Sequence, residues 1–174
     1  MKSNLSLQLA PPWKTKPAGQ EANRTIDRLI QQYADKLSPA VTLAALVRVR
    51  LESIFNLLDD LCIETCPRCP EPCCSHASPW FDYRDLLFFH LNAVTPPVSQ
   101  PIEVFNATCR FFSMRGCSLE RISRPWICTW YVCPVQTGNL NIRRSHQKKD
   151  LTSVFNEIKA FRKDMEASFI RAIT

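Results

Sequence analysis

The sequence predicts a mainly α-helical protein in which helices flank an irregular, cysteine-rich middle segment. Apolar residues recur at the i, i+3, i+4, i+7 spacing of amphipathic helices near both ends of the chain. The middle stretch "CIETCPRCPEPCC" instead crowds prolines between cysteines and therefore cannot be a regular helix. With only 3 glycines in 174 residues, the chain has little scope for tight β-hairpins.

The chain length suits one compact domain. Apolar residues make up 45% and charged residues 22%, which is usual for a soluble globular protein. We expect an extended, proline-containing arm over residues 1–22. We expect a single helical domain over residues 23–174, with the cysteine cluster at 62–134.

Two helices are expected before the cysteines, and their apolar faces indicate a packed hairpin. Residue Ser38 is expected to cap the second helix, with Pro39 at its first position and its end near Leu61. The stripe of the first helix is Ile26, Leu29, Ile30, Tyr33 and Leu37, and that of the second is Leu43, Val47, Leu51, Ile54, Leu58 and Leu61.

Two further helices are expected after position 80. Asp82 is expected to cap a short helix in "YRDLLFFHLN", and Asp150 to cap a C-terminal helix. Residues 101–112 are consistent with a short strand or an irregular segment, and residues 109–133 with irregular structure. The stripe of the C-terminal helix is Leu151, Val154, Phe155, Ile158, Phe161, Met165, Phe169 and Ile173.

The nine cysteines admit disulfide, redox or metal chemistry. Their odd number, and the absence of any sequence signal for an oxidising compartment, argue against a disulfide framework. The C-x-x-C of Cys66 and Cys69 could serve redox chemistry, but the βαβ pattern of thioredoxin-like proteins is missing.

Metal binding accounts for most of the thiols. A C-x-x-C places two thiolates on one turn, where both reach a zinc ion at about 2.3 Å. A second group of cysteines, from Cys109 to Cys133, would close on the first. The expected metal ligands are Cys66, Cys69, Cys73, Cys74, Cys109, Cys117, Cys128 and Cys133.

The type and number of metals stay open, because thiolates suit both zinc and iron–sulfur clusters. Neighbouring side chains in extended chain point to opposite sides, so Cys73 and Cys74 can serve two centres. The alternatives are one or two zinc ions on four thiolates each, or one iron–sulfur cluster on four cysteines. Cys62 continues a helix stripe and is interpreted as core. His76 could replace a cysteine, although a solvent-facing histidine is favoured.

The stretches "CPRCPEPCC", "YRDLLFF" and "CRFFSMRGCSLERISRPWIC" resemble the CxxCxxCC family of zinc- or iron-chelating cysteine-cluster proteins. The resemblance spans roughly 66–133. The spacings from Cys69 to Cys73 and from Cys117 to Cys128 are each one residue longer than in the family. The matching positions are Cys66, Cys69, Cys73, Cys74, Cys109, Cys117, Arg124-Pro125 and Cys128, with Asp85 on the helix between the cysteine groups. The resemblance implies metal chelation.

Charged residues near the cysteines have two expected roles. Four thiolates on zinc carry a formal charge of −2, so Arg124, fixed by Pro125, is expected to support the cluster from outside the ligand shell. Asp59 and Asp60 lie near the end of a helix, where acidic residues are disfavoured. Pairing with arginines of the cysteine region would explain them.

The function expected from the sequence is that of a cytoplasmic metal-binding protein whose metal holds the fold and serves a binding or scaffold role. An iron–sulfur electron-transfer protein and a metal-dependent enzyme are the alternatives. A protein partner stays open. No stretch is long and apolar enough for a membrane span. The net charge of +6 gathers near the C-terminal end, but no basic stripe alternates with aromatics, which disfavours nucleic-acid binding.

Overall fold

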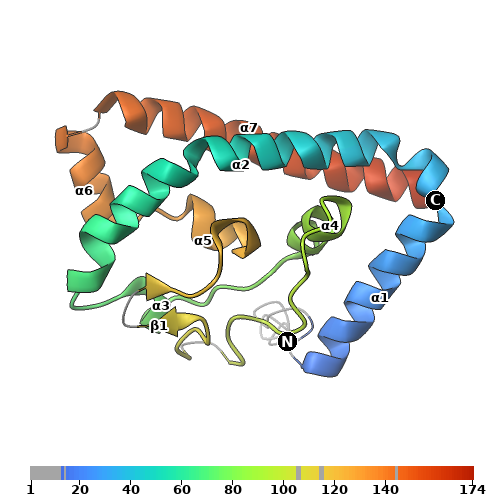
Figure 1. Cartoon of the computed structure of the whole chain (residues 1–174), viewed down its shortest axis with the longest axis horizontal. Helices are drawn as coiled ribbons and strands as arrows, with labels where there is room; N and C mark the ends of the chain where they lie inside the picture. Colours follow the sequence, from blue (N-terminus) through green and yellow to red (C-terminus); the bar gives the residue numbers. More distant parts are fainter. Residues whose placement is uncertain (1–12, 14, 105–106, 114–115, 144) are drawn as a thin grey trace, which may run out of the picture.

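The computed structural model is mainly helical, which confirms the mainly α part of the predicted fold class; the metal-binding role of the middle segment stays a prediction. It describes residues 13, 15–104, 107–113, 116–143 and 145–174. Two long helices, α2 (Ser38–Thr65) and α7 (Ser145–Ile173), pack side by side and run in opposite directions (Figure 1). Helix α1 (Lys16–Gln32) lies at one end of this pair and α6 (Pro134–Arg143) at the other. These four helices form a frame.

The chain between α2 and α6 fills one side of the frame with short elements (Figure 1). Strand β1 pairs antiparallel with β2, with Phe112 opposite Cys117. Gly116 has a φ of 103°, a conformation that side-chain-bearing residues rarely adopt, and it begins β2. The short elements are η3 (Cys66–Arg68), α3 (Cys73–His76), α4 (Tyr83–Leu91), β1 (Phe112–Ser113), β2 (Gly116–Cys117), η4 (Arg121–Ser123) and α5 (Trp126–Trp130).

The core lies between α2, α7 and α4. Most of the predicted stripe residues of α2 and α7 are buried there. This confirms the prediction that these periodic apolar residues form the buried faces of two helices. Phe81 and Phe89 add an edge-to-face aromatic pair with ring centroids 5.8 Å apart. The buried stripe residues are Val47, Leu51, Ile54, Leu58 and Leu61 on α2, and Leu151, Ile158, Met165 and Phe169 on α7.

The N-terminal helix begins earlier than the sequence predicts. Thr15 Oγ1 accepts a hydrogen bond from the Ala18 N–H at 3.4 Å, and Pro17 stands in the first turn. Residues 16–22, which were expected to be extended, are therefore helical. The helix ends at Gln32, and Ala34–Lys36 forms the 3-10 helix η2 before Leu37. Residues 1–12 of the expected arm lie outside the described residues.

Two predicted caps are wrong. Leu37, without a side-chain hydrogen bond, holds the cap position of α2, and Ser38 is already helical. Asp150 lies inside α7, which begins at Ser145. The polar residues that precede Leu151 leave no apolar stripe by which the first turns of α7 could be recognised. Helix α2 also continues past Leu61, to Thr65.

The predicted cap of α4 is confirmed. Asp82 Oδ1 accepts from the Asp85 N–H at 2.8 Å, and Asp85 Oδ2 accepts from the Asp82 N–H at 3.0 Å. The two residues thus form a reciprocal capping box. Within the described residues, no helix has both the length and the apolar character that crossing a bilayer would require.

Candidate metal centre

The two cysteine groups, which α4 separates in the sequence, meet in the structure. The Cys109 N–H donates a hydrogen bond to the Cys74 carbonyl oxygen at 3.0 Å. This bond fixes the start of the second group directly on the double cysteine of the first. Side-chain electrostatics extend the contact, because charge on Cys128 and on Cys117 acts on Cys74. The remote segments therefore converge, as the sequence predicts.

The end of α2 and the start of η3 hold the first pair of thiols, Cys62 and Cys66. Cys62 and Cys66 lie one helical turn apart, and a hydrogen bond from the Cys66 thiol is the main cause that lowers the pKa of Cys62 to about 5. The guanidinium of Arg121 adds a hydrogen bond to the sulfur at 3.3 Å. The same thiol–thiolate bond, with burial, raises the pKa of Cys66. The two thiols therefore ionise as a pair.

The double cysteine repeats this arrangement. A hydrogen bond from the Cys74 thiol lowers the pKa of Cys73 to about 7, while that bond and burial raise the pKa of Cys74. Cys73 also lies within electrostatic reach of Cys62 and of Cys128. The double cysteine therefore stands between the α2 pair and the second cysteine group.

The second group joins three thiols from separate elements. Burial raises the pKa of Cys109, which is 7% exposed, and Cys117 adds its charge to the same effect. Cys117 sits on β2 and Cys128 within α5. Cys128 is an exposed residue, although protein atoms crowd around its sulfur. This crowding, with charge on Cys109 and Cys117, raises its pKa.

Two predicted ligands lie at the margin of the cluster. Cys69 is half-buried just after η3, where its N–H donates to the Cys66 carbonyl at 3.2 Å. Cys133 is half-buried before α6, and its N–H donates to Gln136 Oε1 at 3.4 Å. The side chain of His76 lies outside the described residues. All nine cysteines are described, and all are free.

The donor chemistry fits a soft metal, whereas the geometry is not closed around one. Several thiols share one region and influence one another's ionisation, as ligands of zinc or of an iron–sulfur cluster must. Across the part of the chain that the structure describes, no three Cys, His, Asp or Glu side chains already form a group that could hold an ion. Metal binding would therefore require the sulfur atoms to draw together.

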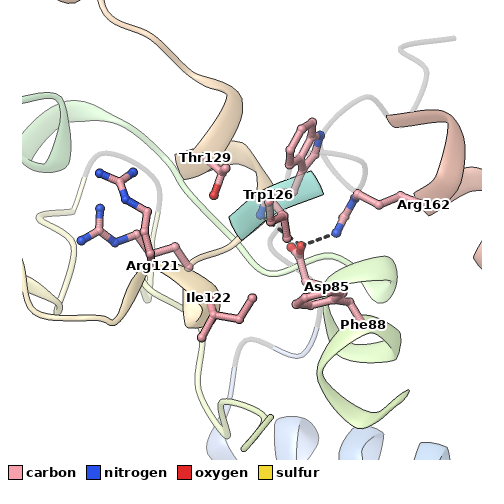
Figure 2. A pocket seen from close by; sticks show the side chains of 9 residues that line it. Asp85, Phe88, Arg121, Ile122, Trp126, Thr129 and Arg162 are labelled. Carbon is pink, nitrogen blue, oxygen red and sulfur yellow. Dashed lines mark hydrogen bonds and ion pairs between the residues drawn. The ribbon is translucent and has the colours of Figure 1, made fainter. Parts of the chain in front are cut away.

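A small cavity of about 10 Å³, partly open to solvent and lined by three arginines, lies beside Arg121, whose guanidinium reaches the Cys62 sulfur (Figure 2). Arg121 pairs with Asp59 at 2.7 Å, which confirms the predicted role of that acidic residue. Arg124 Nε donates to the Leu119 carbonyl at 3.1 Å, and its positive charge helps to lower the pKa of Cys62. The supporting role expected for Arg124 stays a prediction. The lining residues are Leu51, Asp85, Phe88, Arg121, Ile122, Arg124, Trp126, Thr129 and Arg162.

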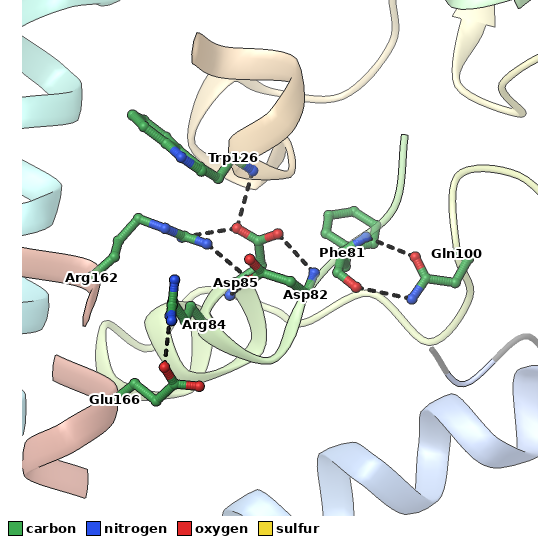
Figure 3. Close-up of polar contacts among 8 residues, drawn as sticks. All are labelled: Phe81, Asp82, Arg84, Asp85, Gln100, Trp126, Arg162 and Glu166. Carbon is green, nitrogen blue, oxygen red and sulfur yellow. Dashed lines mark hydrogen bonds and ion pairs between the residues drawn. The ribbon is translucent and has the colours of Figure 1, made fainter. Parts of the chain in front are cut away.

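A buried ion pair fixes α5, which carries Cys128, to the frame (Figure 3). Asp85 Oδ1 accepts from the Trp126 N–H at 3.0 Å and from Arg162 Nη1 at 2.9 Å. Arg162 also donates to Asp82 and lies over the Trp126 ring, 5.5 Å from its centroid. Burial raises the pKa of Asp85 to about 6, against the lowering effect of Arg162. The carboxylate thus links α4, α5 and α7.

Sequence reasoning missed Arg162 and Gln136. Arg162 is four residues after Ile158 and three before Met165, so it falls on the buried stripe of α7, where a charge requires a partner. A charged residue on an apolar stripe could have been recognised from the sequence as one that needs a buried partner. Gln136 is also buried, but no helix was expected over residues 134–143, so no predicted stripe marked it.

Comparison of the chain with protein-family models, with curated protein sequences and with solved structures found no match. The chemistry of the chain's own residues therefore carries the functional assignment.

Proposed function

We propose that the protein is a cysteine-cluster metal-binding protein, whose metal holds the middle of the fold together and gives it a binding or scaffold role. The metal would be zinc, as one or two ions, or an iron–sulfur cluster. The order of the cysteines and the Arg124-Pro125 pair make it, in this proposal, a member of the CxxCxxCC family. The residues that would hold the metal are Cys66, Cys69, Cys73, Cys74, Cys109, Cys117, Cys128 and Cys133.

The observation that carries the proposal is the meeting of the two cysteine groups. A backbone hydrogen bond joins Cys109 to Cys74 at 3.0 Å, and thiols from α3, β2 and α5 act electrostatically on one another. Free thiols brought together in this way without disulfides are typical of metal sites. A cytoplasmic location suits nine free cysteines, because that compartment keeps thiols reduced.

The ionisation of the thiols supports the same proposal. Hydrogen bonds to the partner sulfurs raise the pKa values of Cys66 and Cys74, and burial raises those of Cys109 and Cys128. These thiols therefore hold their protons at neutral pH when no cation is near. A metal cation offsets the mutual repulsion of thiolates and takes the place of those protons. Metal uptake is therefore expected to release protons and to grow tighter as pH rises.

The loop-rich middle has a structural need for a metal. Among the described residues of this segment, the two strands have two residues each, and the helices other than α4 have at most five residues. Such a segment gains little from regular backbone hydrogen bonds. Binding energy from a metal becomes folding energy when the ligands come from segments that only the fold brings together.

The deciding experiment is elemental analysis and absorption spectroscopy of anaerobically purified protein. Zinc in a stoichiometric ratio would support the scaffold role. Iron with sulfide and visible charge-transfer absorption would support the electron-transfer alternative. Metal removal by a chelator is expected to lower the melting temperature by at least about 10 °C. Thiolate metal sites contribute several kcal/mol of stability, and for a protein of this length each kcal/mol shifts the melting temperature by about 2–4 °C. Protein that holds neither metal, and whose melting temperature does not respond to added zinc, would contradict the proposal.

A further inference from the structure

We propose that Cys62, on the last turn of α2, is a ligand of this metal centre together with Cys66, which directly follows the helix. This inference rests on the proposed function and extends its ligand set by a position that the sequence assigned to the core. Cys62 and Cys66 are four residues apart, so their side chains emerge from one face of the helix. The Cys66 N–H closes the last turn on the Cys62 carbonyl, which keeps that spacing helical.

The surroundings of Cys62 are polar, unlike those of a core cysteine. Arg121 Nη2 donates to its sulfur at 3.3 Å and Gln136 Nε2 at 3.6 Å. Both donors are removed from water: the Arg121 side chain is 7% exposed and Gln136 is 8% exposed. A core cysteine packs among apolar groups, whereas buried N–H donors that point at a sulfur are typical of metal-bound thiolates.

The two donors are themselves fixed in place. Asp59, one turn before Cys62 on α2, holds Arg121 by an ion pair at 2.7 Å. Gln136 donates a second bond to Thr65 Oγ1 at 3.3 Å and accepts one from the Cys133 N–H at 3.4 Å. The amide of Gln136 thus ties the Cys62 sulfur to the segment of another predicted ligand, Cys133.

A third thiol completes the neighbourhood. The sulfur atoms of Cys62, Cys66 and Cys73 lie near enough to one another for a charge on one to be felt by another. Cys62 therefore belongs to the same set of interacting thiols as two of the predicted ligands. Bound to a zinc ion with other thiolates, it would add to a net negative charge that Arg121 is placed to offset.

Titration with Co²⁺, which binds the same ligand types as zinc, tests the proposal. Wild type, Cys62→Ser and Ile63→Ser are compared by the cobalt–thiolate charge-transfer absorption and by affinity in competition with a chelator. Ile63 is the matched control, because it stands on the same turn of α2 but is 73% exposed. Cys62→Ser is expected to lose part of the absorption and to bind cobalt at least about tenfold more weakly, with Ile63→Ser unchanged. Absorption and affinity equal to those of wild type in Cys62→Ser would overturn the inference.

Alkylation of the wild-type protein gives the answer even if Cys62→Ser fails to fold. Iodoacetamide labelling with and without Co²⁺, followed by peptide mass mapping, reports each thiol separately. Cys62 is expected to be protected by the metal together with Cys117. If cobalt protects Cys117 but not Cys62, the inference fails and the proposed function stands. If wild type binds no cobalt and no thiol is protected, both fail.

Discussion

At the scale of single residues, Asp85 is an almost fully buried carboxyl group. Its side chain is 4% exposed and faces Arg162, which is equally buried. Three hydrogen-bond donors converge on the carboxylate: the Asp82 and Trp126 N–H groups and the guanidinium. Even so, burial outweighs these interactions and raises the pKa of Asp85 to about 6. The carboxylate therefore provides specific connections between elements at a cost in stability.

Because the pKa of Asp85 is raised in the folded protein, this residue makes the free energy of unfolding fall as pH rises. The folded protein binds the Asp85 proton more tightly than the unfolded chain, whose ordinary pKa is 3.8. Its contribution to stability is present below about pH 4 and is lost as pH rises through 6. The stability of wild type relative to Asp85→Asn, measured by urea unfolding, is expected to fall by on the order of 2 to 3 kcal/mol between pH 4 and pH 7. Other titrations occur in both proteins and cancel. A difference that is constant, or that grows with pH, would contradict this assignment.

Arg124 gives a second prediction at this scale. Its charge acts on Cys62, and its Nε is anchored to the Leu119 carbonyl. Arg124→Ala is expected to weaken metal binding about tenfold in competition with a chelator, because groups around the ligands commonly contribute that much. Arg48→Ala is the control, since Arg48 forms an exposed ion pair on α2. Unchanged metal affinity and melting temperature in Arg124→Ala would remove the supporting role.

At the scale of elements, the position of α1 depends on the close approach of one glycine to a loop. A Cβ at Gly19 would collide with the Val98 carbonyl oxygen. Asn23, one turn further along α1, donates to the Pro97 carbonyl at 2.9 Å and contacts His90 of α4 at 2.9 Å. Helix α1 is therefore held against the loop after α4 by backbone contact as well as by apolar packing.

Gly19→Ala is expected to lower the free energy of unfolding by about 1–3 kcal/mol, because the loop would have to move away from the helix. Gly138→Ala is the matched control. Gly138 lies within α6, and a Cβ there would meet nothing within 4 Å. That variant is expected to gain up to about 1 kcal/mol from helix propensity. Chemical denaturation of both variants checks the pair, and equal effects would show that α1 does not depend on this approach.

At the scale of the whole molecule, the antiparallel pair of α2 and α7 provides a packed helical support. The cysteine region, which consists of short elements, has no such support of its own. The fully buried side chains of α7, among them Phe169 and Met165, pack in the core with those of α2 and α4. The two ends of the domain should therefore keep helical structure when the middle is disturbed by metal removal or by cysteine substitution.

Two neighbouring residues of α7 test which face of this helix packs into the core. Phe169 is fully buried, whereas Ile170 is 46% exposed. Phe169→Ala is expected to cost about 3–5 kcal/mol in the free energy of unfolding, since it leaves a cavity in the core. Ile170→Ala should cost less than about 1 kcal/mol. Urea denaturation monitored by circular dichroism measures both, and similar costs would contradict the orientation of α7 described above.

The sequence by itself determined the mainly helical class, the buried stripes of α2 and α7 and the cap of α4, because helical periodicity and capping are local and can be read along the chain. It also located the two cysteine-rich segments, because a high local content of cysteine is visible in the composition of each segment. Only the tertiary structure decided which groups meet: Cys74 with Cys109, Arg121 with Asp59 and Cys62, and Arg162 with Asp85. These contacts join residues far apart in the sequence, and their energy depends on burial and distance, which no local pattern encodes.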